Sequence, residues 1–193
     1  WISYDDRAST EVFINEVQRR TALLQAACAT GADWVLAVDP DERMESGLAP
    51  AINELLGAED PRAYTFRLRE LYAPDAYRVD GIWNEKRQAR LLSLRHGLAA
   101  PEGNLHLSWA SFVNEPQLHN TDFNLYHLKM ITAERRKARA SLYKHLDPEH
   151  QAQSFGYDYL ADETGAVLEG IAPGREYHPA HEEDGGLWMA RLV

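Results

Sequence analysis

The chain has 193 residues, of which 45% are hydrophobic, and this composition suits a single domain with an ordinary core. Thirty acidic residues against 20 basic ones give a formal net charge of −10, which makes duplex nucleic acid, itself a polyanion, a poor candidate for the main partner. The single cysteine, Cys28, excludes a disulfide framework and multi-cysteine zinc sites. No apolar run approaches the roughly 18 residues of a membrane-spanning helix.

These features favour a cytoplasmic protein without a transmembrane segment. Cys28 lies in an apolar helical stretch, so we expect it to be an ordinary buried thiol. The chain starts at Trp1 rather than at a methionine, and no leader-like pattern follows it. We therefore expect further sequence upstream of Trp1.

The first predicted element is a helix that follows a Ser9 or Thr10 cap and ends before Gly31. Its apolar side chains at helical spacing are Phe13, Val17, Leu24 and Cys28. Residues 34–38 then form a continuous apolar run, which predicts a central strand of a parallel sheet, buried on both faces. A second helix ends at Gly57, and its apolar side chains are Leu48, Ile52 and Leu55.

Residues 64–69 alternate apolar and polar side chains, which is the pattern of a half-exposed strand. Residues 90–94 and 123–128 are further predicted strands, and the stretch 97–117 is mostly a predicted loop. Thr132 caps a predicted helix that Asp147-Pro148 closes. The apolar side of that helix is expected to carry Ala138, Leu142 and Leu146. The pattern as a whole predicts an α/β fold with a mixed sheet.

The most informative motif is Asp39-Pro40-Asp41, directly after the predicted strand 34–38. Ligands of open α/β sheets bind beyond the carboxyl ends of the strands. Two carboxylates at this spacing can converge on Mg²⁺ or Mn²⁺, which prefer oxygen ligands and retain substrate phosphates in their coordination shell. The alternative interpretation is a solvated acidic turn, because two acids at this spacing are common in an acidic protein.

The segment Gly31-Ala-Asp-Trp-Val-Leu-Ala-Val-Asp-Pro-Asp-Glu-Arg43 resembles the core of family 2 glycosyltransferases of the GT-A fold. Further stretches that resemble a bacterial branch of this family are 77–83, 86–92, 124–132, 156–160 and 174–177. The resemblance implies a GT-A-like (Rossmann-like) mixed sheet flanked by helices. It also implies that residues 1–150 are the C-terminal part of the glycosyltransferase domain, which lacks the N-terminal strands that bind the nucleotide base, and that 151–193 are an extension packed on it.

The same resemblance assigns roles around the acidic motif. It makes Asp41 a direct metal ligand and places Asp39 on the metal or on the donor ribose. Glu42 would support both carboxylates, and His127 would complete the site for Mn²⁺ or Mg²⁺. The alternative for His127 is a structural histidine, since histidine has many such uses.

Sugar transfer also requires a base and groups that hold the donor and the acceptor. Asp80 and Glu85 are the candidate catalytic carboxylates, Trp83 between them could stack on a sugar, and Arg20, or its neighbour Arg19, matches an arginine near the donor phosphates. The alternatives are solvated surface acids and a helix-surface arginine.

Two other patterns are less specific. The basic run 135–139 could meet a phosphate or an anionic membrane surface, or could be solvated. His178 and His181 have the spacing of a ligand pair, but no third partner accompanies them, which favours an exposed tail.

The predicted function is therefore metal-dependent, inverting transfer of a sugar from a nucleotide-sugar donor to a hydroxyl of a saccharide or lipid-linked acceptor. Peripheral contact with the inner face of a membrane would fit a lipid-linked acceptor. The alternatives are a related nucleotidyltransferase and a non-catalytic carbohydrate-binding or interaction module. A haloacid dehalogenase-type phosphatase is disfavoured because Glu42 and Arg43 follow the acidic motif.

Overall fold

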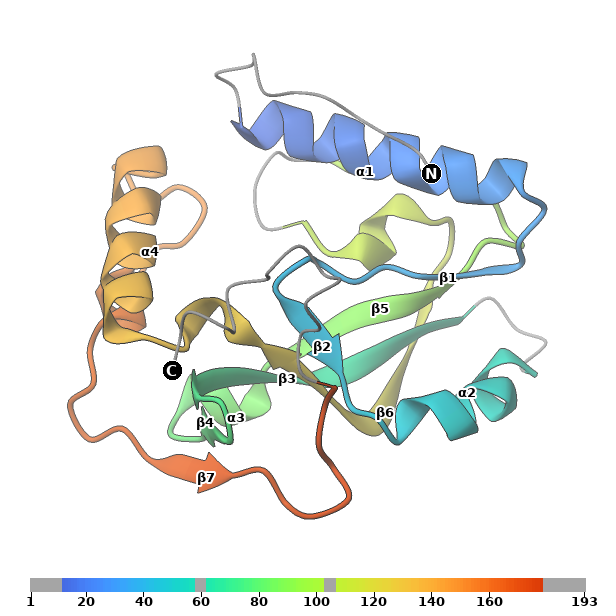
Figure 1. The fold of residues 1–193 in the computed structure, drawn as a ribbon. Coiled ribbons are helices and arrows are strands. Elements are labelled where there is room, and N and C mark those ends of the chain that lie inside the picture. Colours follow the sequence, from blue (N-terminus) through green and yellow to red (C-terminus); the bar gives the residue numbers. More distant parts are fainter. Residues whose placement is uncertain (1–11, 58–61, 103–106, 179–193) are drawn as a thin grey trace. The chain divides into compact units, whose positions relative to one another are not determined.

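The computed structural model describes residues 12–57, 62–102 and 107–178, and its elements are labelled in Figure 1. The helices are α1 (Val12–Ala29), α2 (Leu48–Leu56), α3 (Ile82–Glu85) and α4 (Ala133–Leu146), with 3₁₀ turns η1 (Trp109–Phe112), η2 (Leu128–Met130) and η3 (Asp158–Leu160). The strands are β1 (Trp34–Leu36), β2 (Glu42–Met44), β3 (Arg62–Ala73), β4 (Ala76–Arg78), β5 (Arg87–Ser93), β6 (Gln117–His127) and β7 (Leu168–Gly170). The predicted α/β class is confirmed.

Within the described residues, the seven strands are hydrogen-bonded in the order β1-β5-β3-β4-β7, and β6 pairs with both β3 and β2. The chain divides into two compact units. The first unit comprises Trp1–Val38, Asn53–Phe66 and Gln88–Thr121, and the second comprises Asp39–Ile52, Arg67–Arg87 and Asp122–Val193. No helix in the described part of the chain is long and apolar enough to cross a membrane.

The first unit has an apolar core. Its buried members include Leu24 of α1, Leu92 of β5, and Trp109 and Phe112 of η1. The prediction that the first helix ends before Gly31 is confirmed: α1 ends at Ala29, and Gly31 has a positive φ of 76°, which glycine adopts without steric cost. The predicted loop 97–117 contains η1 and contributes core residues, although its sequence lacks periodicity.

The prediction for residues 34–38 is wrong in its placement. β1 is three residues long, stands at one end of the strand order and pairs antiparallel with β5. Val35 packs against the core of the first unit, whereas Leu36 is 39% exposed. Trp34 stacks on Tyr64 at 5.8 Å between ring centroids. One side of the run, with Val35, faces the core. The other side carries Trp34, which stacks on Tyr64, and the exposed Leu36. A continuous apolar run therefore does not require burial on both faces.

Strand β3 is confirmed, but of its three alternating polar side chains only Arg67 is partly exposed, whereas Thr65 and Arg69 are buried. In the first unit, Thr65 is buried and its hydroxyl donates to Asn120 Oδ1 at 2.6 Å. In the second unit, Arg69 is buried and donates to Asn124 Oδ1 at 3.1 Å and to Asn84 Oδ1 at 2.8 Å. The two buried polar side chains of this face are therefore satisfied by amide side chains.

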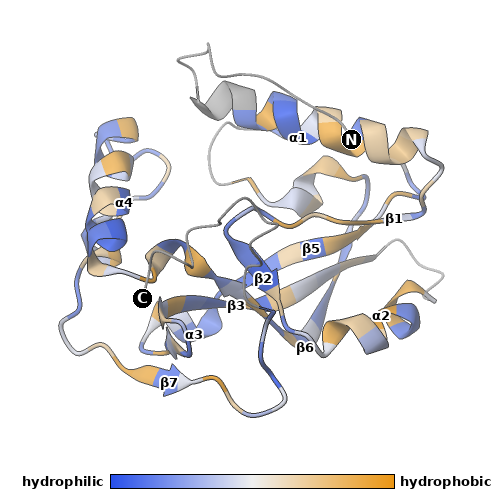
Figure 2. Ribbon diagram, in the orientation of Figure 1, coloured by the Kyte–Doolittle hydropathy of each residue, from blue (hydrophilic) through white to orange (hydrophobic). Residues whose placement is uncertain are grey.

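Helix α4 begins as predicted, with the Thr132 hydroxyl accepting from the Arg135 amide, but it buries a different face. Leu142 is half exposed, while Arg136 and Ala140 are buried. The Arg136 guanidinium donates to Glu163 at 2.7 Å and to the carbonyl of Met130, so its burial leaves no charge unpaired. Figure 2 shows hydrophilic and hydrophobic residues mixed along this helix.

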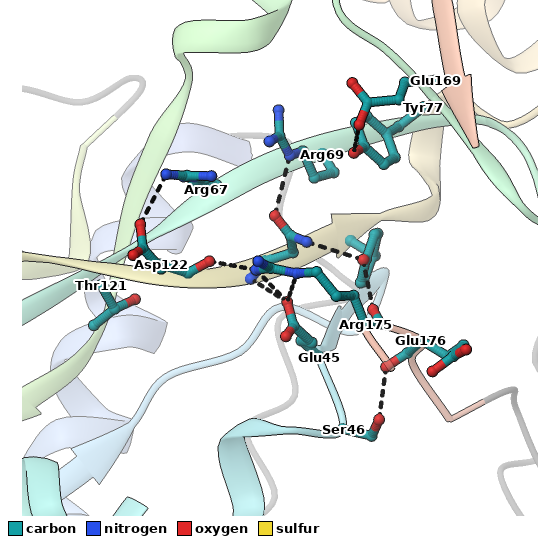
Figure 3. A network of polar contacts seen from close by, with 12 residues as sticks. Glu45, Ser46, Arg67, Arg69, Tyr77, Thr121, Asp122, Glu169, Arg175 and Glu176 are labelled. Carbon is teal, nitrogen blue, oxygen red and sulfur yellow. Dashed lines mark hydrogen bonds and ion pairs between the residues drawn. The ribbon is translucent and has the colours of Figure 1, made fainter. Parts of the chain in front are cut away.

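A polar network fixes β6 against β2 and the segment around Arg175 (Figure 3). Glu45 Oε2 accepts from the Asn124 amide at 2.9 Å and from Arg175 Nη2 at 2.8 Å. The Asn124 side-chain amide donates to the Tyr126 hydroxyl, which donates in turn to the Arg175 carbonyl at 2.6 Å. These contacts hold the end of β6, where His127 lies.

Candidate functional site

The site is built on the turn between β1 and β2. Asp39, Pro40 and Asp41 form this turn, and β2 begins at Glu42. The Asp39 amide donates to Glu42 Oε2 at 3.0 Å, and the Glu42 amide donates to the Asp39 carbonyl at 3.0 Å. Glu42 therefore stabilises the backbone of the acidic turn, and its predicted support of the two carboxylates stays a prediction.

Strand register brings the turn to His127. β2 pairs antiparallel with β6 so that Glu42 is opposite His127, and the Leu128 amide donates to the Asp41 carbonyl at 2.9 Å. His127 Nε2 lies 3.4 Å from Asp41 Oδ2. The prediction that His127 and the acidic turn meet in space is confirmed.

A third residue of this site, Glu70 of β3, was missed from the sequence. It is 3% exposed, and its Oε2 lies 2.8 Å from His127 Nδ1. Lys86 Nζ lies 3.7 Å from Glu70 Oε1, and Lys129 Nζ lies 4.0 Å from Asp41 Oδ2. The imidazole of His127 is thus held between two carboxylates, each accompanied by a lysine. Tyr64, Phe66 and Leu68 alternate with polar residues, and Glu70 stands where the next apolar side chain is expected; this break in the alternation was the signal that could have identified it.

The charges of the three groups are strongly coupled. Burial alone would lower the pKa of His127, but Glu70 and Asp41 outweigh it and raise the pKa to about 9. Burial would raise the pKa of Glu70, yet His127 and Lys86 lower it to about 2. The pKa of Asp41 is also lowered, because the hydrogen bond and charge of His127 overcome the effect of burial. At neutral pH an imidazolium therefore lies between two ionised carboxylates.

The geometry also fits a shared divalent cation. When Nδ1 donates to Glu70, Nε2 is the nitrogen that faces Asp41, the arrangement in which a carboxylate orients a metal-binding histidine. Two ligands about 2.1 Å from one ion, at octahedral or tetrahedral angles, lie roughly 3.0–3.4 Å apart. The observed 3.4 Å matches this separation. Among the described residues, however, no three His, Cys, Asp or Glu side chains form a complete ligand set, so other ligands would have to come from substrate or water.

The candidate bases Asp80 and Glu85 and the candidate sugar-stacking residue Trp83 lie in or next to α3. Both oxygens of Asp80 accept from Arg78, at 2.7 and 2.8 Å, and this pairing lowers the pKa of Asp80 to about 2, which makes it a weak base. Trp83 is only 2% exposed, with Lys86 Nζ 3.9 Å from its ring centroid. A buried indole offers no open face for sugar stacking. Glu85 ends α3 and is exposed.

Arg20 belongs to the first unit. Its guanidinium donates to the Leu107 carbonyl at 2.8 Å, pairs with Glu16 at 2.7 Å and lies 4.6 Å from the Trp109 ring centroid. These contacts give Arg20 a structural role within that unit, and its contact with donor phosphates stays a prediction. His178 is exposed, and His181 lies outside the described residues.

Comparison with known proteins adds nothing to the assignment: no family model, curated protein or solved structure matches the chain significantly.

Proposed function

We propose that the chain is the metal-binding part of a GT-A-like glycosyltransferase that uses a nucleotide-sugar donor. The observation that carries the proposal is the convergence of Asp41 and His127, 3.4 Å apart, with Glu70 bound to the other imidazole nitrogen. The resemblance of residues 31–43 to family 2 glycosyltransferases supports the same assignment.

The proposed transfer requires the negative charge of the leaving diphosphate to be neutralised and the proton of the acceptor hydroxyl to be removed. A divalent cation on Asp41 and His127, with Asp39 assisting, would neutralise the diphosphate as the bond from its oxygen to the sugar breaks. The acceptor hydroxyl forms the new bond at the same carbon and gives its proton to a carboxylate base. Because Asp80 is neutralised by Arg78, Glu85 is the better of the two predicted bases. Lys129, whose side chain is 45% exposed beside Asp41, would contact a phosphate of the donor.

A non-catalytic module is the second candidate, and one observation favours it. An imidazolium between two carboxylates is a satisfied ion-pair network that needs no metal to be stable. The two functions differ in whether metal displaces the proton on His127 Nε2.

Mn²⁺ binding separates the two candidates. In electron paramagnetic resonance titrations we expect wild-type protein to bind Mn²⁺ more tightly when uridine or guanosine diphosphate is present. Asp41→Ala should weaken that binding at least about tenfold, since even the loss of an outer group that orients a metal ligand typically costs about 10- to 100-fold in affinity. Asp75→Ala, which removes an exposed acid from the β3–β4 turn of the same unit, is the matched control and should leave binding unchanged. Equal Mn²⁺ affinity in wild type and Asp41→Ala would exclude the metal assignment.

A further inference from the structure

A second site lies beside α3 in the second unit. It is a pocket of about 390 Å³, lined by residues 78 and 80–83 and by Phe155, Tyr159 and Asp162. None of Asp41, Glu70 and His127 is among the lining residues. The pocket is therefore a surface distinct from the candidate metal site.

One part of the lining is apolar and exposed to solvent. Phe155 is 68% exposed and Ile82 is 47% exposed. The ring centroids of Phe155 and Tyr159 are 5.4 Å apart, and those of Tyr159 and Trp83 are 5.5 Å apart. Exposed apolar groups that adjoin a pocket mark a binding surface, because leaving them in water is unfavourable. An aromatic face of this kind suits a ligand with a flat apolar side.

The remaining lining sets the charge of the ligand. The Arg78 guanidinium is occupied by Asp80, the Tyr72 hydroxyl and the Asp162 carbonyl. Asp162 adds an exposed carboxylate, which accepts hydrogen bonds and donates none. Arg78, Asp80 and Asp162 together carry a net charge of −1, so an anionic ligand is disfavoured and a ligand with hydroxyl donors is favoured.

Bare backbone completes the lining. Gly81 has a positive φ of 50°, and a Cβ placed on it would meet no atom within 4 Å. A ligand can therefore approach the backbone here without displacing a side chain.

We propose that this pocket binds a neutral saccharide ring, with its apolar face on Phe155 and its hydroxyls donating to Asp162. The proposal rests on the proposed function, for which it identifies the acceptor site. A chain of contacts joins the pocket to the metal site: Lys86 lies over the Trp83 ring at 3.9 Å and pairs with Glu70, which holds His127.

Saturation-transfer difference NMR on the full chain tests the proposal. The probes are methyl β-D-glucoside and methyl β-D-galactoside, with glucuronate as the anionic comparator and benzyl alcohol as the purely aromatic one. We expect transfer to the CH protons of at least one glycoside. Phe155→Ala should weaken its binding about tenfold, whereas Phe155→Tyr, which keeps the aromatic face, should retain it. Leu118→Ala, which removes an exposed leucine of the first unit, should have no effect.

Three results would overturn the saccharide assignment: neither glycoside binds, Phe155→Ala binds as wild type does, or glucuronate or benzyl alcohol binds as tightly as the better glycoside. Mn²⁺ binding is measured on the same samples and should be unchanged by Phe155→Ala. A chain that binds a glycoside through Phe155 but binds no Mn²⁺ would retain the pocket assignment and lose the transferase function, so the two failures are distinguishable.

Discussion

The two units bury different kinds of side chain. The first unit is held by apolar groups such as Leu24, Leu92 and Phe112, and Arg90 is its one buried charge within the described residues. The second unit buries many more charged groups: Glu42, Glu45, Arg69, Glu70, Arg78, His127, Arg136 and Asp147. Burying charge costs free energy unless each group is paired, and such groups concentrate where a protein binds or transforms ligands. The proposed metal site lies among these buried charges, in the second unit.

The largest effect is expected from removing the central buried carboxylate. Glu70→Ala leaves His127 and Lys86 without their shared partner, and we expect the free energy of unfolding to fall by about 3–5 kcal/mol near neutral pH. Chemical denaturation followed by circular dichroism measures this change. The loss should become smaller as the pH rises above 9, because His127 is then neutral in the wild type as well. A pH-independent loss would mean that the charge pairing does not account for it.

The matching change in the first unit is Leu92→Ala. Leu92 is fully buried, and deleting its branched side chain should cost about 2–5 kcal/mol through lost burial and the cavity left behind. Because no titrating group is involved, the loss should be the same at pH 6 and pH 9 in the same denaturation experiment. A marked pH dependence would contradict the contrast between the two units.

The wild type should lose stability in mildly alkaline solution. His127 has a folded-state pKa of about 9, above its ordinary value of 6.5, so its contribution is complete below pH 6.5 and is lost as the pH rises to 9. We expect a loss of about 2–3 kcal/mol over this window, from the free-energy equivalent of the shift. Glu70 behaves oppositely: its lowered pKa means that stability is lost only as the pH falls from about 4.5 toward 2. Unfolding midpoints at pH 6, 7.5 and 9 measure the alkaline slope, and His127→Gln should flatten it.

Local signals in the sequence predicted the elements better than their partners. Gly31, Gly57 and Thr132 mark helix ends through backbone conformation and capping, which act within a few residues, and all three predictions hold. The position of β1 depends on its pairing with β5, some 55 residues away, and apolar content alone could not show it. The prediction that His127 lies beside the acidic turn came from the family resemblance and not from periodicity.

Glu70 and Lys86 were missed for a related reason. Lys86 looks like an ordinary surface charge in the sequence, and Glu70 differs from one only by breaking the alternation of its strand. A charged residue is buried only when tertiary structure supplies its partner. Asp80 and Trp83 were predicted from the segment in which they lie. In the structure, Arg78 neutralises Asp80 and Lys86 covers the ring of Trp83. Residue types thus indicated the region of the candidate site. The contacts of Asp80 and Trp83, which the sequence does not show, disfavour the base and sugar-stacking roles predicted for them.

In the proposed site, Asp41 and His127 share a divalent cation while Glu70 retains the proton on His127 Nδ1. Nitrogen NMR of the imidazole, recorded at pH 7.5 with and without Mg²⁺ and a nucleoside diphosphate, tests it most directly. We expect both nitrogens to be protonated in the metal-free protein, and only the Nε2 proton to be lost at saturating metal. An imidazole that keeps both protons at saturating metal and diphosphate would contradict it and leave His127 as part of an ion-pair network.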